Sequence, residues 1–211
     1  GYSGSSWSQL GSDINGEATE DLSGSSVSLS NDGTKVAIGA YGNDGNGTSS
    51  GHVRVYGYSG SSWSQLGSDI NGEAQYDLSG HSVSLSSDGT KVAIGAVGND
   101  ANGSYSGHVR VYSWNGSGWI QLGSDIDGEA SGDESGRSVS LSSDGTKVAI
   151  GAPYNDGNGT SSGSVRVYQY SGSSWSQLGA DIDGEASSDR SGYSVSLSSD
   201  GTKVAIGAYG N

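Results

Sequence analysis

The sequence predicts an all-β fold built from repeated antiparallel sheets, and three observations lead to this prediction. First, a unit of 56 residues returns without insertion or deletion, as the tryptophans at one repeat position show: Trp7, Trp63, Trp119 and Trp175. Second, each unit carries an Asp-Gly pair between two runs of alternating apolar and small polar residues, which is the strongest short-range signal for a β-hairpin. Third, large apolar residues occupy one face of these runs and Ser, Ala and Gly the other, which suits stacked sheets.

Four short strands are predicted in each unit, and the first copy serves as the example. Residues 6–10 form an outer strand that belongs to the sheet of the preceding unit. Residues 26–30 and 35–40 form the hairpin, because the Asp-Gly pair between them supplies a tight turn. Residues 52–56 form a further strand, in which valines alternate with polar residues.

Four antiparallel strands per unit, repeated radially, are typical of a β-propeller, in which each blade buries its faces against its neighbours. We therefore predict one repeat domain over residues 1–211, with repeats 1–56, 57–112, 113–168 and a partial copy, 169–211. Two kinds of connection then share one face of the disc: the inter-blade segment (residues 11–25 and its copies) and the long loop (residues 41–51 and its copies). We call this the loop face, and expect it to carry the function.

An isolated arc of blades would expose apolar blade faces and an unpaired strand edge. The chain starts at Gly1 without an initiator methionine and stops at Asn211 inside a repeat. We therefore expect a segment of a longer chain, or a ring closed by another copy. Residues 6–10 could supply the missing outer strand of the final blade.

The composition argues against several functional classes. A hydrophobic content of 31% and a net charge of -14 are typical of disorder, but the strict period argues against that interpretation. Because cysteine is absent, the chain has no disulfide, thiol nucleophile or thiolate metal site. The acidic surface repels nucleic acid and anionic lipid, and no apolar run approaches the length of a membrane span. We expect neither nucleic-acid binding nor membrane insertion.

The repeat resembles two propeller families. The hairpin followed by His-Val-Arg-Val-Tyr is similar to the core of WD-repeat blades. The unit also resembles the FG-GAP repeat of integrin α-type propellers. The resemblance rests on a glycine followed by residues 26–29, on residues 38–40, and on an Asn/Asp-rich loop before residues 53–56. The family glycine would match Gly24, Gly80, Gly136 and Gly192, although serine replaces the phenylalanine before each of them. The resemblance implies an adhesion or interaction scaffold.

The long loops are candidate calcium sites. The calcium loop of that family has the pattern Asp-x-Asp-x-Asp-Gly, whereas each long loop of this chain has one carboxylate, namely Asp44, Asp100 or Asp156. Calcium takes about six to eight oxygen ligands, so Asn43, Asn46, Asn99, Asn102, Asn155, Asn158 and backbone carbonyls would have to contribute. The alternative, which we favour, is that Asn, Asp and Gly satisfy turn geometry. Calcium is the one cofactor that the sequence suggests.

The long loops also carry N-glycosylation tripeptides at one position, beginning at Asn46, Asn102 and Asn158, and a fourth begins at Asn115. Recurrence on an exposed loop favours modification in a secreted protein, and chance occurrence in Asn- and Ser-rich sequence is the alternative.

Carboxylates recur in the inter-blade segment, as Asp13, Glu17 and Asp21 in the first copy. Paired carboxylates can hydrolyse glycosides, but an active site needs one pair, whereas these return in every repeat. We expect them to brace loops by hydrogen bonds, with a shared cation site as the alternative.

His52 and His108 share one repeat position, so we interpret them as packed or solvated imidazoles. We therefore expect no enzyme.

The first two copies differ at eight of 56 positions, and seven of these lie on the loop face. Such variation is typical of a diversified binding surface, and drift in permissive loops is the alternative. The candidate ligand-face residues are Ser25, His81, Arg137, Tyr193, Tyr76 and Tyr105.

These patterns together predict an extracellular or cell-surface structural protein, such as a matrix, filament or adhesin component. Its partners would be further copies of itself, other extracellular proteins or glycans. The alternative is a lectin-like propeller that stacks sugars on tyrosines of the loop face, namely Tyr41, Tyr76, Tyr105, Tyr154 and Tyr193. A polysaccharide-acting enzyme ranks third.

Overall fold

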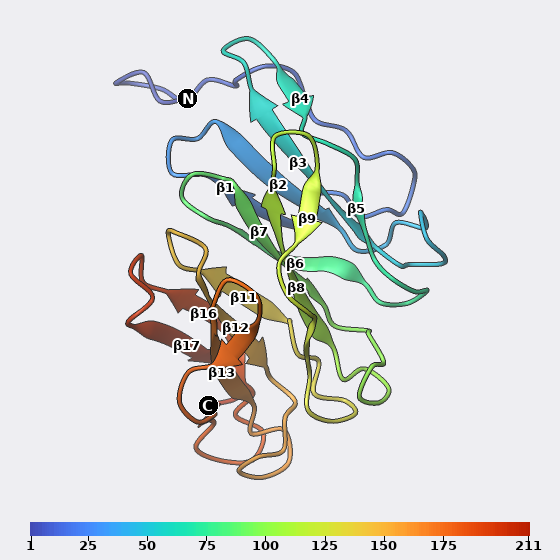
Figure 1. The fold of residues 1–211 in the computed structure, drawn as a ribbon, viewed down its shortest axis with the longest axis vertical. Helices are drawn as coiled ribbons and strands as arrows, with labels where there is room; N and C mark the ends of the chain where they lie inside the picture. Colours follow the sequence, from blue (N-terminus) through green and yellow to red (C-terminus); the bar gives the residue numbers. More distant parts are fainter.

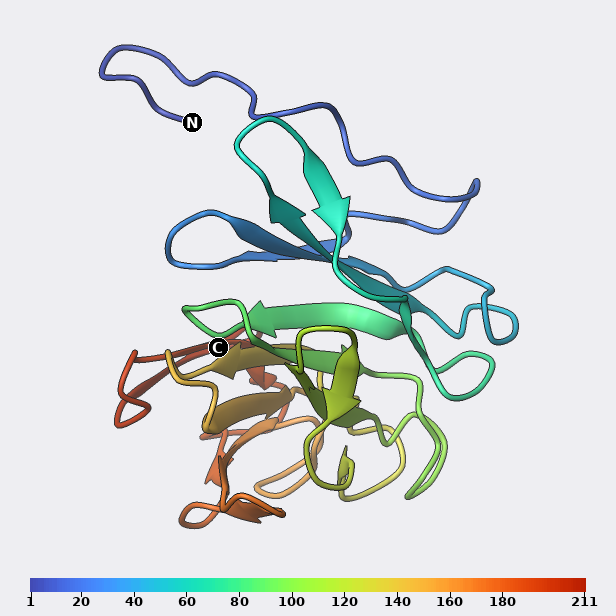
Figure 2. The same cartoon turned by 45° about the horizontal axis from the view of Figure 1, so that its top comes forward.

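The computed structural model describes residues 1–211 and consists of strands β1 to β17 joined by turns and loops. Figures 1 and 2 show the sheets stacked along an arc, with the first blade and the C-terminal strands at opposite ends. Repeated antiparallel sheets confirm the predicted all-β propeller fold. The structure contains no helix with the length and apolar content that crossing a membrane requires.

The first three blades have the same strand order. The first comprises β1 (Ser26–Leu29), β2 (Lys35–Ala40), β3 (His52–Tyr58), β4 (Trp63–Gln65) and β5 (Ile70–Asn71). The second comprises β6 (Ser79–Leu85), β7 (Lys91–Ala96), β8 (His108–Trp114), β9 (Trp119–Gln121) and β10 (Ile126–Asp127). The third comprises β11 (Ser138–Leu141), β12 (Lys147–Ala152), β13 (Ser164–Tyr170), β14 (Trp175–Gln177) and β15 (Ile182–Asp183). The fourth sheet pairs β16 (Ser191–Leu197) with β17 (Val204–Ala208).

The outer strand of each blade differs from the prediction, because it is split in two. Both β4 and β5 pair with β3, and Val53 of β3 lies opposite Ile70 of β5. Residues 6–10, expected to form the same kind of strand, make only an isolated bridge between Tyr2 and Trp7, since the structure contains no strand of a preceding blade to pair with them. Trp63 Nε1 of β4 donates to Leu10 O, which holds this segment at the end of the arc opposite β17 (Figure 1).

Successive blades are joined by one set of hydrogen bonds that repeats at each junction. Between the first two blades, Ser26 Oγ donates to Gly80 O (2.7 Å) and Leu85 N donates to Ser28 Oγ (2.9 Å). Equivalent bonds join the second blade to the third and the third to the fourth. The small polar face of each inner strand therefore bonds to the next blade.

Large apolar side chains fill the space between blades in two clusters. The first contains Ala37, Val53, Val55, Ile70, Leu85, Val92, Ile94 and Tyr112, and the second contains Ala93, Val109, Val111, Ile126, Val139, Leu141, Val148 and Ile150. Each fully buried Val, Leu or Ile contributes roughly 1.5–3 kcal/mol. Because the first blade has no neighbour on its outer side, Val27 is 64% exposed whereas the equivalent Val139 is 9% exposed.

Blade spacing also depends on glycines in the second strands. A Cβ added at Gly95 of β7 would overlap the carbonyl oxygen of Gly136, which belongs to the next blade. The same conflict would arise at the equivalent glycines, Gly39 and Gly151. Only glycine allows the two backbones to approach this closely.

We predict that Gly95→Ala lowers the free energy of unfolding by about 2–4 kcal/mol, because overpacking at this junction separates two blades. Urea denaturation measures the effect. The matched control is Gly118→Ala, since a Cβ at this position would meet no atom within 4 Å. Equal stabilities of the two variants would contradict the role of the glycine junction.

Each hairpin turn is held by its aspartate. Asp144 Oδ1 accepts hydrogen bonds from Ser142 Oγ (2.7 Å), Thr146 N (3.0 Å) and Thr146 Oγ1 (2.9 Å). The bond from Ser142 and those from Thr146 favour the ionised form and hold the pKa of Asp144 below its ordinary value. In the first blade, bonds from the Thr34 backbone, Ser30 and the Thr34 side chain lower the pKa of Asp32 to about 2.

A carboxyl group with a lowered pKa in the folded state stabilises the fold above its ordinary pKa of 3.8, and this stabilisation is lost as pH falls toward 2. We predict that Asp144→Asn is less stable than wild type at neutral pH, and that its stability falls less between about pH 5 and pH 2.5. Urea denaturation at both pH values tests this. Asn31→Ala, an exposed change beside the turn of the first blade, should keep the wild-type acid dependence. If Asp144→Asn also keeps it, the prediction is wrong.

Candidate functional site

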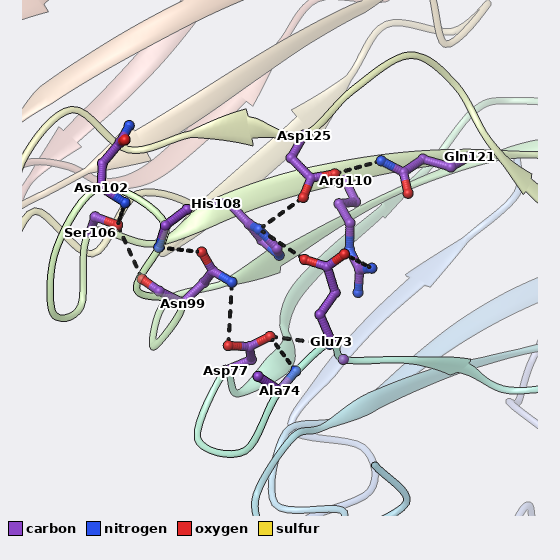
Figure 3. A network of polar contacts seen from close by, with 12 residues as sticks. Glu73, Ala74, Asp77, Asn99, Asn102, Ser106, His108, Arg110, Gln121 and Asp125 are labelled. Carbon is purple, nitrogen blue, oxygen red and sulfur yellow. Dashed lines mark hydrogen bonds and ion pairs between the residues drawn. The ribbon is translucent and has the colours of Figure 1, made fainter. Parts of the chain in front are cut away.

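The loop face is braced by a buried aspartate in each repeat. In the second repeat, Asp77 Oδ2 accepts from Glu73 N (3.1 Å) and Ala74 N (2.9 Å), and Asp77 Oδ1 accepts from Asn99 Nδ2 (3.3 Å; Figure 3). Its carbonyl oxygen also accepts from Gly98 N (3.0 Å). Asp77 therefore ties the inter-blade segment to the long loop, as the bracing interpretation expects.

The predicted calcium residues have protein partners in the long loops and in the inter-blade segments. Asp44, Asp100 and Asp156 are exposed, and each accepts a backbone hydrogen bond five residues further on, at 2.7, 2.8 and 2.7 Å. Asn43, Asn99 and Asn155 are buried against the bracing aspartates, while Asn46, Asn102 and Asn158 donate to the carbonyls of Gly72, Gly128 and Gly184. This bonding favours the turn-geometry alternative.

The same bonds bear on the predicted glycosylation sites. In Asn46, Asn102 and Asn158, the side-chain nitrogen that glycosylation would modify donates to backbone carbonyls. Asn115 lies on the exposed turn between β8 and β9, and its Oδ1 accepts bonds from Ser117 and Gly118 while its Nδ2 makes no bond. Asn115 is thus the one of the four acceptors whose side-chain nitrogen is not engaged in a hydrogen bond.

Four of the predicted ligand-face residues occupy equivalent positions just before or within the inner strands, namely Ser25, His81, Arg137 and Tyr193. The Arg137 guanidinium lies 4.9 Å from the Tyr193 ring centroid and its Nη2 donates to Tyr193 Oη (3.0 Å), while Nη1 pairs with Glu134 (3.1 Å). His81 packs against Tyr41 at 5.6 Å, and burial together with the charge of Arg137 lowers the pKa of His81 to about 4. The structure thus brings His81, Arg137 and Tyr193 together.

The remaining predicted face residues are separate from that group. Ser25 Oγ donates to Gly39 O (3.3 Å) in the first blade. Tyr76 and Tyr105 are 54% and 46% exposed on the loops of the second blade. A cleft of ≈ 570 Å³ lies between residues 18–22 and 41–49 of the first blade, so the loop face is hollowed between its two kinds of connection.

A second polar cluster joins inter-blade segments to a strand, and its members come from three segments (Figure 3). His108 begins β8, Glu73 lies in the inter-blade segment, and Asp125 precedes β10. His108 Nδ1 is 3.9 Å from Glu73 Oε2 and 3.5 Å from Asp125 Oδ2, and Arg110 Nη1 is 3.3 Å from Glu73 Oε1. Burial, followed by the charge of Arg110, lowers the pKa of His108 to about 4, so its imidazole is neutral at pH 7.

The cluster recurs one repeat earlier and changes one repeat later. In the earlier copy, His52 Nδ1 is 3.7 Å from Glu17 Oε2 and 3.8 Å from Asp69 Oδ2. In the later copy, serine replaces histidine at position 164. These two groups of His, Glu and Asp are the ones in the structure whose ligand atoms could hold a metal ion.

The sequence pattern did not predict that these three side chains form one cluster. The recurrence of histidine is explained equally well by packed imidazoles at His52 and His108, and the recurrence of the carboxylates by loop bracing. The signal was available in the repeat pattern, since histidine and both carboxylates recur at the same spacing. Spacing along the chain could not show that the three side chains face one another.

We predict that Asp77→Ala lowers the free energy of unfolding by about 2–3 kcal/mol, because it leaves buried donors without partners. Asp100→Ala is the control, since its exposed carboxylate accepts one backbone bond, and should cost less than about 1 kcal/mol. Urea denaturation compares the two variants. A cost for Asp77→Ala no larger than that of the control would show that Asp77 does not brace the loop face.

Comparisons with known structures show the fold. The chain is similar to Kuenenia stuttgartiensis hydrazine synthase, with a TM-score of 0.54, 14% identity, and coverage of 92% of this chain and 44% of that one. It is also similar to a protein described as a putative 6-phosphogluconolactonase from Bacteroides uniformis, with a TM-score of 0.57, 10% identity, and coverage of 86% and 46%. The chain thus spans less than half the length of both structures.

The sequence comparisons concern the repeat itself. No curated protein matches the sequence. The FG-GAP repeat family matches residues 15–56 and 126–168. Each match begins in an inter-blade segment and ends in the strand that follows the long loop. Two of the copies of the 56-residue unit thus match the FG-GAP repeat, and the fold of the chain is a β-propeller.

Proposed function

We propose that this repeat scaffold acts outside the cell as a structural or adhesive component, and that its loop face binds the partner. The observation that carries the proposal is the distribution of differences between copies. Seven of the eight differences between the first two repeats lie on the loop face, whereas the residues that join blades are repeated. A constant frame with variable loops is typical of binding proteins.

The extracellular location is supported by two further features. The net charge of -14 favours solubility and disfavours nucleic-acid partners. Asn115 presents an acceptor tripeptide on an exposed turn away from the blade junctions. Under this proposal the chain is not an enzyme, because its carboxylate pairs recur in successive blades rather than in one distinct environment.

A lectin-like function is the second candidate, and two tyrosines favour it. Tyr76 and Tyr105 expose about half of their side chains on the second blade, as a sugar-stacking platform requires. The other candidate tyrosines already pack within the protein: Tyr41 against His81, Tyr154 against Arg190, and Tyr193 against Tyr209. Sugar binding would therefore centre on the second blade.

The test measures retention under flow of beads coated with the chain, on surfaces that carry either the chain itself or a panel of extracellular glycans. We predict retention on at least one surface, and a loss of about tenfold in the double variant Tyr76→Ala/Tyr105→Ala, because exposed aromatic side chains dominate binding surfaces. Retention on glycans alone would identify the lectin.

The control is Ile120→Ala, which removes a side chain that is 55% exposed on β9, outside the loop face. This variant should retain wild-type adhesion. Absence of retention on every surface, or an equal loss in the control, would contradict a binding role for the loop face.

A further inference from the structure

We infer that the Glu73–His108–Asp125 cluster and the Glu17–His52–Asp69 cluster each bind a divalent transition-metal cation, with Zn²⁺ as the best fit. In each cluster one histidine nitrogen and one oxygen from each carboxylate lie within 4.8 Å of one another. Ligands bound to Zn²⁺ at about 2.1 Å in a tetrahedron are about 3.4 Å apart. The distances of 3.5 and 3.9 Å from His108 Nδ1 to the two carboxylates need little adjustment to meet this spacing.

The histidine provides the second, independent observation. His108 is 1% exposed, and neither of its ring nitrogens has a hydrogen-bond partner. A buried polar atom left without a partner costs about 1–3 kcal/mol. A cation bound to Nδ1, which faces Glu73 and Asp125 in Figure 3, satisfies this nitrogen, while Nε2 stays without a partner. His52 is buried to the same extent and is also without partners.

Each carboxylate is oriented by a neighbour that leaves one oxygen for the cation. Glu73 directs Oε1 to Arg110 and Oε2 to His108. Asp125 accepts a bond from Gln121 Nε2 on Oδ1 (2.6 Å) and directs Oδ2 to His108. Such outer contacts hold metal ligands in place in known sites.

The earlier cluster divides its oxygens in the same way. Glu17 directs Oε1 to Arg54 (3.6 Å), and Asp69 Oδ1 accepts from Gln65 Nε2 (2.7 Å), so that the other oxygen of each carboxylate faces His52. The whole arrangement is therefore a repeated feature of the first two blades.

The charges and donor types select the class of cation. Two carboxylates and one guanidinium leave each cluster with a net charge of about -1, which a divalent cation offsets. Imidazole nitrogen suits zinc and other first-row transition metals, whereas calcium takes oxygen ligands in larger number. The site therefore differs in chemistry from the long-loop residues considered for calcium.

The third blade supplies an internal control. Glu129, Arg166, Gln177 and Asp181 retain the same contacts, but Ser164 stands where the histidine would be. Serine at this position is therefore compatible with a folded blade. The wild-type chain should bind two cations, and the histidine alone should decide which blades bind a cation.

The test is the stoichiometry of Zn²⁺ bound to the chelator-treated chain, measured by isothermal titration calorimetry and by elemental analysis after gel filtration. We expect two Zn²⁺ per chain for wild type, one for His108→Ser and none for His52→Ser/His108→Ser. Ser164→His should raise the number to three. His81→Ser, which removes a histidine outside both clusters, should still bind two.

A spectroscopic measurement separates ligation from nonspecific attraction to an acidic surface. Co²⁺ should give visible absorption bands of a four-coordinate site in wild type, at half intensity in His108→Ser and not at all in the double variant. Zn²⁺ should also raise the melting temperature of wild type but not of the double variant, because a ligand that binds only the folded state stabilises it. Zn²⁺ binding that survives in the double variant, or is absent in wild type, would overturn the inference.

Discussion

The fold depends on the close approach of glycine backbones at each blade junction. Gly39, Gly95 and Gly151 each face the backbone of a glycine in the next blade, and serines of the inner strands bond across the same junction. Because side chains are absent there, sheets of short strands with a low apolar content can still bury their valines and isoleucines against one another. The low aliphatic content is thus compatible with an ordered core.

The junction also determines which residues are free to differ. Each junction uses the facing surfaces of two successive sheets, so the variable side chains of the long loops and inter-blade segments lie outside it. A buried aspartate such as Asp77 holds these loops by backbone bonds that do not depend on the neighbouring side chains. Side chains such as Tyr76 and Tyr105 can therefore vary on the loop face, while the clusters around His52 and His108 recur in successive blades.

Local signals predicted much of this arrangement. The Asp-Gly pairs correctly located the hairpins, because the aspartate itself organises the turn through bonds to residues within two positions. The split of the outer strand into β4 and β5 was missed, since both halves carry weak strand signals and are defined by pairing with β3. The left-handed backbone of Leu78 (φ 57°) was also not predicted, because leucine rarely adopts this conformation.

The sequence by itself determined the repeat period, the hairpins, the loop face and the propeller class, because each rests on contacts between residues close in the chain or on strict repetition. Only the tertiary structure decided that Glu73, His108 and Asp125 meet, and that the long-loop aspartates bond within their own loops while the asparagines bond to the inter-blade segments. The reason is physical. Residues from an inter-blade segment, from the start of β8 and from the segment before β10 become neighbours only when the blade folds, and the direction of each side chain is set by partners such as Arg110 and Gln121.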